Sequence, residues 1–91
     1  MAEQRIQIKL PQEKAGGVYA DFVRAWHTQD AFVLDFSTLT DPPHQQDGAV
    51  VLDATVVSRV RIPPGQVFEL MKALEVQLTA WEKENPAKRN G

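Results

Sequence analysis

Apolar and polar residues alternate along the first two thirds of the chain, which is the two-residue period of a β-strand. The alternation in residues 5–10 predicts a first strand, and Pro11 ends it because proline has no amide proton for a ladder hydrogen bond. Further β-prone runs begin at Val18 and at Phe32. The short polar break 28–30 between these two runs predicts that they form an antiparallel hairpin.

A longer polar segment separates the third predicted strand from the fourth. Residues 40–48 contain two adjacent prolines and an Asp-Gly pair, and this turn chemistry predicts the longest loop of the domain. Alternation resumes at Val50 and continues to Ile62, which predicts one long fourth strand.

The spacing of apolar residues changes to a helical period after residues 63 and 64, which are both proline. Proline at the first helical position loses no hydrogen bond, so the helix is predicted to begin at Pro64 or Gly65 and to end at Asn85. The apolar residues step by four, three, four and three along one side of this helix: Val67, Met71, Leu74, Leu78 and Trp81. A helix with one apolar side needs a surface to cover that side.

These elements predict an α+β fold in which a four-stranded antiparallel sheet precedes one long C-terminal helix (β-β-β-β-α), with the helix packed on one face of the sheet. A chain of 91 residues is too short for a second core, so we expect a single domain over residues 1–86 and a disordered tail over residues 87–91.

Composition narrows the range of functions. The net charge of −2 gives no overall positive field that would attract nucleic acid or anionic lipid. The absence of cysteine excludes disulfides and thiolate chemistry, and it favours a cytoplasmic location. Because no apolar run approaches the ~20 residues that cross a bilayer, we also expect no membrane anchor.

Few residues have the context that catalysis or metal binding requires. A metal site could be drawn from His44, Asp41 and Asp47, but the neighbouring prolines stiffen that loop without supplying ligand geometry. Asp35 is a candidate acid or base, although a carboxylate that faces solvent or an interface arginine is the favoured interpretation. The sequence therefore predicts no catalytic residue, cofactor or metal site, and a protein that is not an enzyme.

A second apolar surface favours self-association, as a dimer or a dimer of dimers, or binding of a protein or peptide partner. The side of the predicted sheet opposite the helix is more apolar than exposure to water would favour. The predicted interface residues, on that side and on the helix, are Tyr19, Val23, Ala25, Val33, Val51, Val57, Met71, Leu78 and Trp81.

Nucleic-acid binding is an alternative function that depends on basic residues in two predicted strands. If the first and fourth strands were neighbours, four cations would form one basic strip: Arg5, Lys9, Arg59 and Arg61. Cations that balance nearby acidic residues on a solvated sheet are the favoured interpretation.

Two parts of the chain resemble a small prokaryotic family, domain of unknown function 3467. The first part is Gly17-Val18-Tyr19-Ala20-Asp21-Phe22-Val23, then His27 and Phe32-Val33-Leu34-Asp35-Phe36, and the second is Val56, Arg59, Val60, Pro63, Leu70, Leu74 and Leu78. The resemblance implies no catalytic residue.

The predicted order of elements is also similar to the subunit plan of the export chaperone SecB, which assembles through its sheets and helices and binds unfolded chains. By topology alone, this similarity implies a chaperone-like or peptide-binding module as the second hypothesis.

Overall fold

Two antiparallel strands joined by a tight turn form the centre of the structure, a computed structural model that describes residues 3–88. They are β1 (Phe22–His27) and β2 (Phe32–Leu39). Thr28 closes the turn: its amide donates to the carbonyl of Ala31 at 2.9 Å, and its Oγ1 accepts from the amide of Ala31 at 3.2 Å. The predicted hairpin is therefore confirmed.

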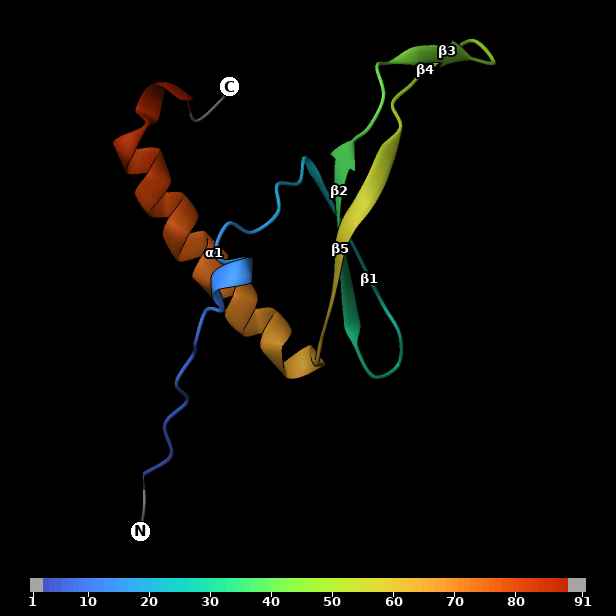
Figure 1. The fold of residues 1–91 in the computed structure, drawn as a ribbon. Coiled ribbons are helices and arrows are strands. Elements are labelled where there is room, and N and C mark those ends of the chain that lie inside the picture. The colour runs from blue at the N-terminus through green and yellow to red at the C-terminus, as the bar shows by residue number, and fades with distance from the viewer. Residues whose placement is uncertain (1–2, 89–91) are drawn as a thin grey trace.

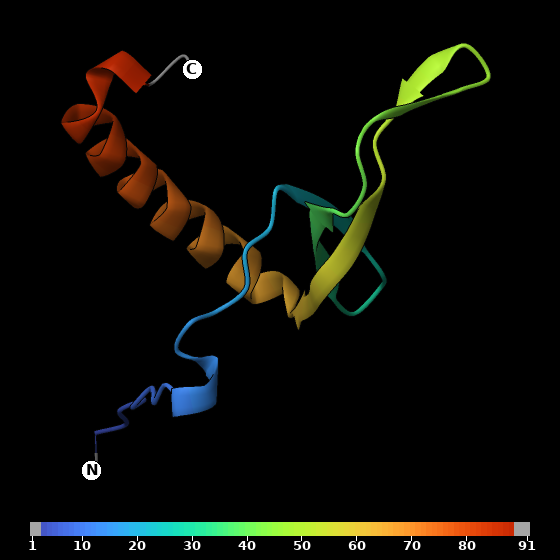
Figure 2. The ribbon, with the colours of Figure 1, turned by 45° about the horizontal axis from the view of Figure 1, so that its top comes forward.

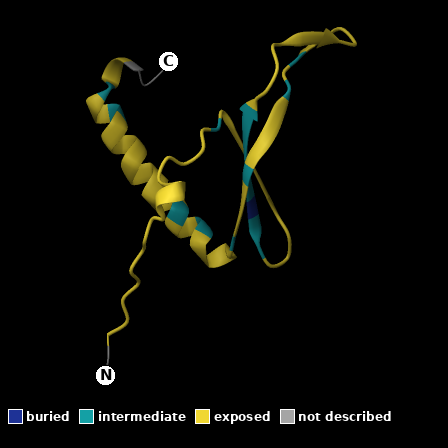
Figure 3. Cartoon of the chain, in the orientation of Figure 1, coloured by how far each residue is buried: buried dark blue, intermediate teal, exposed yellow. Residues whose placement is uncertain are grey.

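Strand β5 (Ala54–Ile62) completes a three-stranded antiparallel sheet in the order β1-β2-β5 (Figure 1). A bulge shifts the register of β2 and β5 between Phe36 and Ser37. Val33 and Asp35 on the central strand β2 are the buried residues within the described part of the chain (Figure 3). The core is therefore small and belongs to β2.

A separate two-stranded sheet occupies part of the predicted loop. Strands β3 (His44–Gln46) and β4 (Ala49–Val51) pair through a two-residue turn in which Asp47 and Gly48 have φ values of 51° and 81°. Asp-Gly suits such a turn because both of its central positions require positive φ. The prediction of one four-stranded sheet is wrong, since the long fourth strand is divided at residues 52 and 53 between two sheets.

The first predicted strand is not a strand in residues 3–10, and residues 1–2 lie outside the described residues. The segment alternates in polarity, but no strand of the same chain pairs with it. It leads instead to the short 3-10 helix η1 (Gln12–Lys14). A strand needs a partner edge for its backbone hydrogen bonds, and alternation alone supplies none.

Helix α1 (Pro64–Glu84) has the predicted boundaries, and the short 3-10 helix η2 (Pro86–Lys88) follows it. The rest of the predicted disordered tail, residues 89–91, lies outside the described residues. α1 diverges from the sheet in both views, so the chain has the outline of a V (Figures 1 and 2). The helix has no buried residue and no extended contact with the sheet, so the expected packing of helix on sheet within one chain is wrong.

Candidate functional site

The register of the three strands divides the sheet into two faces of different chemistry. Residues paired directly across strands lie on the same face, and alternate residues lie on opposite faces. The apolar face carries Val23, Ala25, Phe32, Leu34, Phe36, Val60 and Ile62, together with His27 and Ser58. The charged face carries Arg24, Trp26, Asp35, Arg59 and Arg61, together with Phe22, Val33 and Ser37.

Asp35 is the centre of the charged face. Its side chain is 1% exposed and accepts four hydrogen bonds. Arg59 supplies two of them, from Nε to Oδ1 at 2.6 Å and from Nη2 to Oδ2 at 3.0 Å. Arg24 Nη2 and Trp26 Nε1 each lie 3.1 Å from Oδ2, and the Arg59 guanidinium lies 5.4 Å from the centre of the Trp26 ring. We call these four residues the Asp35 cluster.

The Asp35 cluster has the electrostatics of a structural ion pair. The hydrogen bonds from Arg59, followed by that from Trp26, hold the pKa of Asp35 well below its usual range despite the opposing effect of burial. The same pairing with Asp35 raises the pKa of Arg59. A carboxylate whose oxygens are occupied by fixed donors is a poor proton acceptor at neutral pH.

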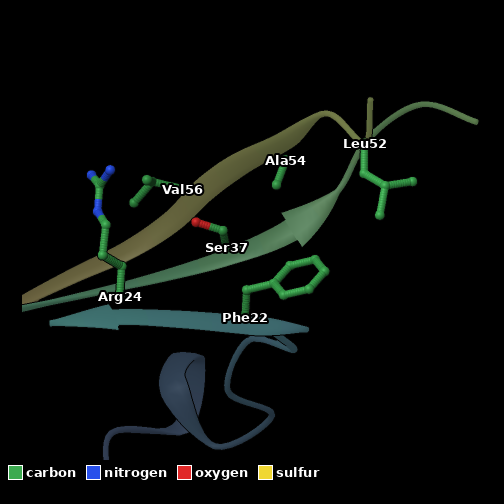
Figure 4. Close-up of a pocket in the computed structure, with 6 residues that line it drawn as sticks. All are labelled: Phe22, Arg24, Ser37, Leu52, Ala54 and Val56. Atoms are coloured by element: carbon green, nitrogen blue, oxygen red, sulfur yellow. The ribbon is translucent and has the colours of Figure 1, made fainter. Parts of the chain in front are cut away.

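An open groove of about 590 Å³ lies on the charged face beside this cluster (Figure 4). Its lining is mostly apolar and comes from all three strands and from the link that precedes β5: Phe22, Arg24, Ser37, Leu52, Ala54 and Val56. Arg24 is the one charged residue in that lining. The groove carries no pair of acid and base groups that would indicate catalysis.

The apolar face and the apolar side of α1 are both largely uncovered. On the apolar face, Val23 on β1 is 60% exposed and Val60 on β5 is 40% exposed, on the two strands that flank β2. We call the residues Val67, Met71, Leu74, Leu78 and Trp81 the helix stripe, and Leu74 at its centre is 60% exposed. Uncovered apolar surfaces are typical of interaction sites in proteins.

The predicted interface residues of the sheet do not share one face. Val23 and Ala25 lie on the apolar face, whereas Val33 pairs with Trp26 on the charged face and is buried. The grouping is wrong because the register of the hairpin places Phe36, not Val33, on the same face as Val23.

The remaining predicted interface residues lie elsewhere. Tyr19 precedes β1, Val51 ends β4, and Val57 lies at the bulge of β5 opposite the step between Phe36 and Ser37. On α1, Met71, Leu78 and Trp81 are exposed on the helix stripe. The structure therefore separates the predicted set into the apolar face, the charged face that holds Val33, the helix stripe and peripheral positions.

The predicted basic residues do not form one strand surface. Arg5 lies in the segment that is not a strand, and its Nη2 is 3.5 Å from Glu3 Oε2. Lys9 lies in the same segment, while Arg61 shares the charged face with Arg59. Because Arg59 is paired with Asp35, the positive charge at this position is already compensated.

The loop histidine is paired with a residue that was not part of the predicted set. His44 Nδ1 lies 3.5 Å from Oδ2 of Asp53, a residue in the link between β4 and β5. Within residues 3–88, no group of three or more His, Cys, Asp or Glu side chains is arranged to hold a metal ion. No helix in the described part of the chain is long and apolar enough to span a bilayer.

The sequence indicated Asp35 but not its partners on β1. The position of the polar turn in the sequence indicates one of these partners, because a turn that closes between Thr28 and Ala31 places Arg24 directly opposite Asp35. Trp26 lies one position further along the same face.

The chain is a small α+β protein, in which a three-stranded antiparallel sheet precedes one long helix. One face of the sheet carries the Asp35 cluster, and the opposite face is the apolar face. The chain belongs to the family described as protein of unknown function (DUF3467), whose model matches residues 1–86. Comparisons with curated proteins and with solved structures gave no match.

Proposed function

We propose that this protein is a homodimeric assembly module that acts by binding protein chains and not by catalysis. The observation that carries the proposal is the surface area of the single chain, 8543 Å² for a mass of 10.2 kDa. A folded monomer of this mass exposes only about 5,300 Å². The excess of roughly 3,200 Å² per chain is surface that a stable monomer would have buried.

The dimensions of the chain support the same conclusion. Its radius of gyration is 17.8 Å, whereas a compact domain of equal length has a value of about 12 Å. Obligate homodimers bury roughly 2,000 to 5,000 Å² in total, which is about 1,000 to 2,500 Å² per chain. The excess surface is therefore large enough for an obligate interface.

The absence of catalysis is part of this proposal and is supported by the chemistry of the most perturbed acid. Asp35 is the one described carboxyl group with a strongly lowered pKa, and its oxygens are occupied by Arg59, Trp26 and Arg24. Its environment stabilises a fixed charge that joins three strands. A group held in this way contributes to folding and leaves binding to the apolar surfaces.

The proposal is tested by the mass in solution of two matched variants. Val23→Asp places a charge on the apolar face. Val50→Asp places a charge at a similarly exposed valine on β4, which is not part of the three-stranded sheet. By light scattering at micromolar concentration, we expect the native chain and Val50→Asp to give a mass near twice 10.2 kDa and Val23→Asp to give the monomer mass. A native chain of 10.2 kDa would contradict the proposal.

Peptide binding is a second candidate function, and the open edge of β1 favours it. Among residues 3–88, β1 pairs only with β2, and all of its residues are exposed, so its outer backbone groups are open to an added strand. An extended client would dock there by β-augmentation. If an excess of the protein leaves the aggregation of an unfolded client unchanged, this second function is wrong.

A further inference from the structure

The connection between the sheet and the helix is a single residue, Pro63. Most connections between a strand and a helix have two to six residues, and that length lets the helix turn back over its own sheet. Pro63 has φ −68° and ψ 152°, and the ring of Pro64 that follows confines it to this extended conformation. The direction of α1 relative to β5 is therefore fixed by two proline rings.

This stiff connection explains why one chain leaves two apolar surfaces bare. α1 leaves β5 along a divergent path, and the amide of Gln66 bonding to the carbonyl of Pro63 at 2.9 Å closes its first turn immediately (Figures 1 and 2). The helix stripe cannot reach the apolar face of the same chain without rearranging Pro63 and Pro64. Each surface therefore needs an occupant from a second molecule.

The helix stripe is longer than the apolar face and can span it. From Val67 to Trp81 the helix stripe extends about 21 Å, at 1.5 Å per residue. From Phe32 to Phe36 the apolar face extends about 13 Å along β2, at roughly 3.3 Å per residue. Apart from His27 and Ser58, both surfaces present apolar side chains, so their contact would bury few polar groups.

The other possible occupants fit less well. The helix stripe on the charged face would cover Arg24 and Arg59 against the single carboxylate of Asp35, and burying the extra positive charge is costly. Two helix stripes packed together would lack complementary charges, because the positions that flank the stripe include Glu75 and Glu82 but no lysine or arginine.

We infer that the dimer forms by helix exchange, in which α1 of each chain packs on the apolar face of the partner's sheet; this inference rests on the proposed function. The exchange is reciprocal, so one two-fold axis generates both contacts and the assembly closes as a dimer. The apolar face and the helix stripe of each chain are then both covered by a second copy of the same chain.

The chain contains no cysteine, which makes cross-linking a clean test. One variant carries Leu74→Cys on the helix stripe, and a second, with an added tag that changes its mass, carries Ala25→Cys on the apolar face. A control chain with the same tag carries Ser37→Cys on the charged face, at the β2 position that pairs with Phe22. Pairs are unfolded together, refolded and treated with a short thiol-reactive cross-linker.

We expect the mixed cross-linked dimer to form from Leu74→Cys with Ala25→Cys, in at least tenfold higher yield than from Leu74→Cys with Ser37→Cys. A high yield from the Ser37 pair, or from Leu74→Cys alone, would overturn helix exchange while leaving dimerisation intact. A native chain with the mass of a monomer would instead overturn the proposed function, so the two failures are distinguishable.

Loosening the connection gives an independent result. Inserting Gly-Ser-Gly-Ser-Gly between Pro63 and Pro64 would let α1 fold back on its own sheet, at an effective concentration on the order of millimolar. At micromolar protein, we expect this variant to be monomeric and as helical as the native dimer. A mass that stays at twice that of the chain would contradict the exchange.

Discussion

Arg59 on β5 and Asp35 on β2 are direct cross-strand partners, and two hydrogen bonds of 2.6 and 3.0 Å join them. Asp35 is also the direct partner of Arg24 on β1, so one carboxylate is shared by the two strands that flank β2. In a chain with so few buried residues, this polar contact fixes the register of the sheet. The Asp35 cluster thereby holds the apolar face in one continuous arrangement.

Asp35→Asn is expected to lower the urea midpoint of unfolding, because two guanidinium groups would lose their shared negative partner. The loss should be several times that of Asp30→Asn, which removes a carboxyl group in the exposed turn after Thr28. Both midpoints are measured at the same protein concentration. Equal midpoints for the two variants would show that the Asp35 cluster does not stabilise the sheet.

The contribution of Asp35 to stability is expected to disappear at low pH. Its pKa in the folded chain is lowered, so the stabilisation is complete above the unfolded value of about 3.9 and is lost as the pH falls below it. The difference in unfolding free energy between the native chain and Asp35→Asn should be constant from pH 7 to about pH 5 and shrink below about pH 4. A difference that grows on acidification would contradict this assignment.

The helix stripe is expected to matter for association although it covers nothing within one chain. Leu78 is 56% exposed on the stripe and Val76 is 64% exposed on another side of α1, so aspartate at either position would affect an isolated chain about equally. In a dimer that buries the stripe, Leu78→Asp should weaken association at least tenfold, by about 1.4 kcal/mol or more. Val76→Asp should change it little. Equal dissociation constants by analytical ultracentrifugation would exclude the stripe from the interface.

Elements whose limits depend on neighbouring residues were predictable from the sequence. The hairpin of β1 and β2 and the limits of α1 follow from a polar break and from prolines, and the structure confirms both. The β3–β4 hairpin was missed although Asp47-Gly48 is a strong signal for a two-residue turn. The two prolines that precede this turn favoured the prediction of a loop.

Long-range arrangement was less predictable, for physical reasons. Residues 5–10 have a strand pattern, but a strand forms only where an edge is available, and the single chain pairs no edge with them. The helix stripe correctly indicated a helix with one apolar side, yet the stiffness of Pro63-Pro64 decided that this side does not pack on the same chain. For Asp35 the sequence favoured a carboxylate that faces solvent or an interface arginine, whereas the structure buries it against two arginines of its own chain, which became evident only from the register.

The most direct test of the central claim, that folding of this chain requires a second copy, is the dependence of the melting temperature on protein concentration. Unfolding of an obligate dimer releases two chains, so the account predicts that Tm rises by roughly 3–5 °C for each tenfold increase in concentration. The melting temperature is measured from the circular dichroism of α1 at 222 nm, at protein concentrations from micromolar to hundreds of micromolar. A sharp transition with the same Tm at every concentration would contradict the account.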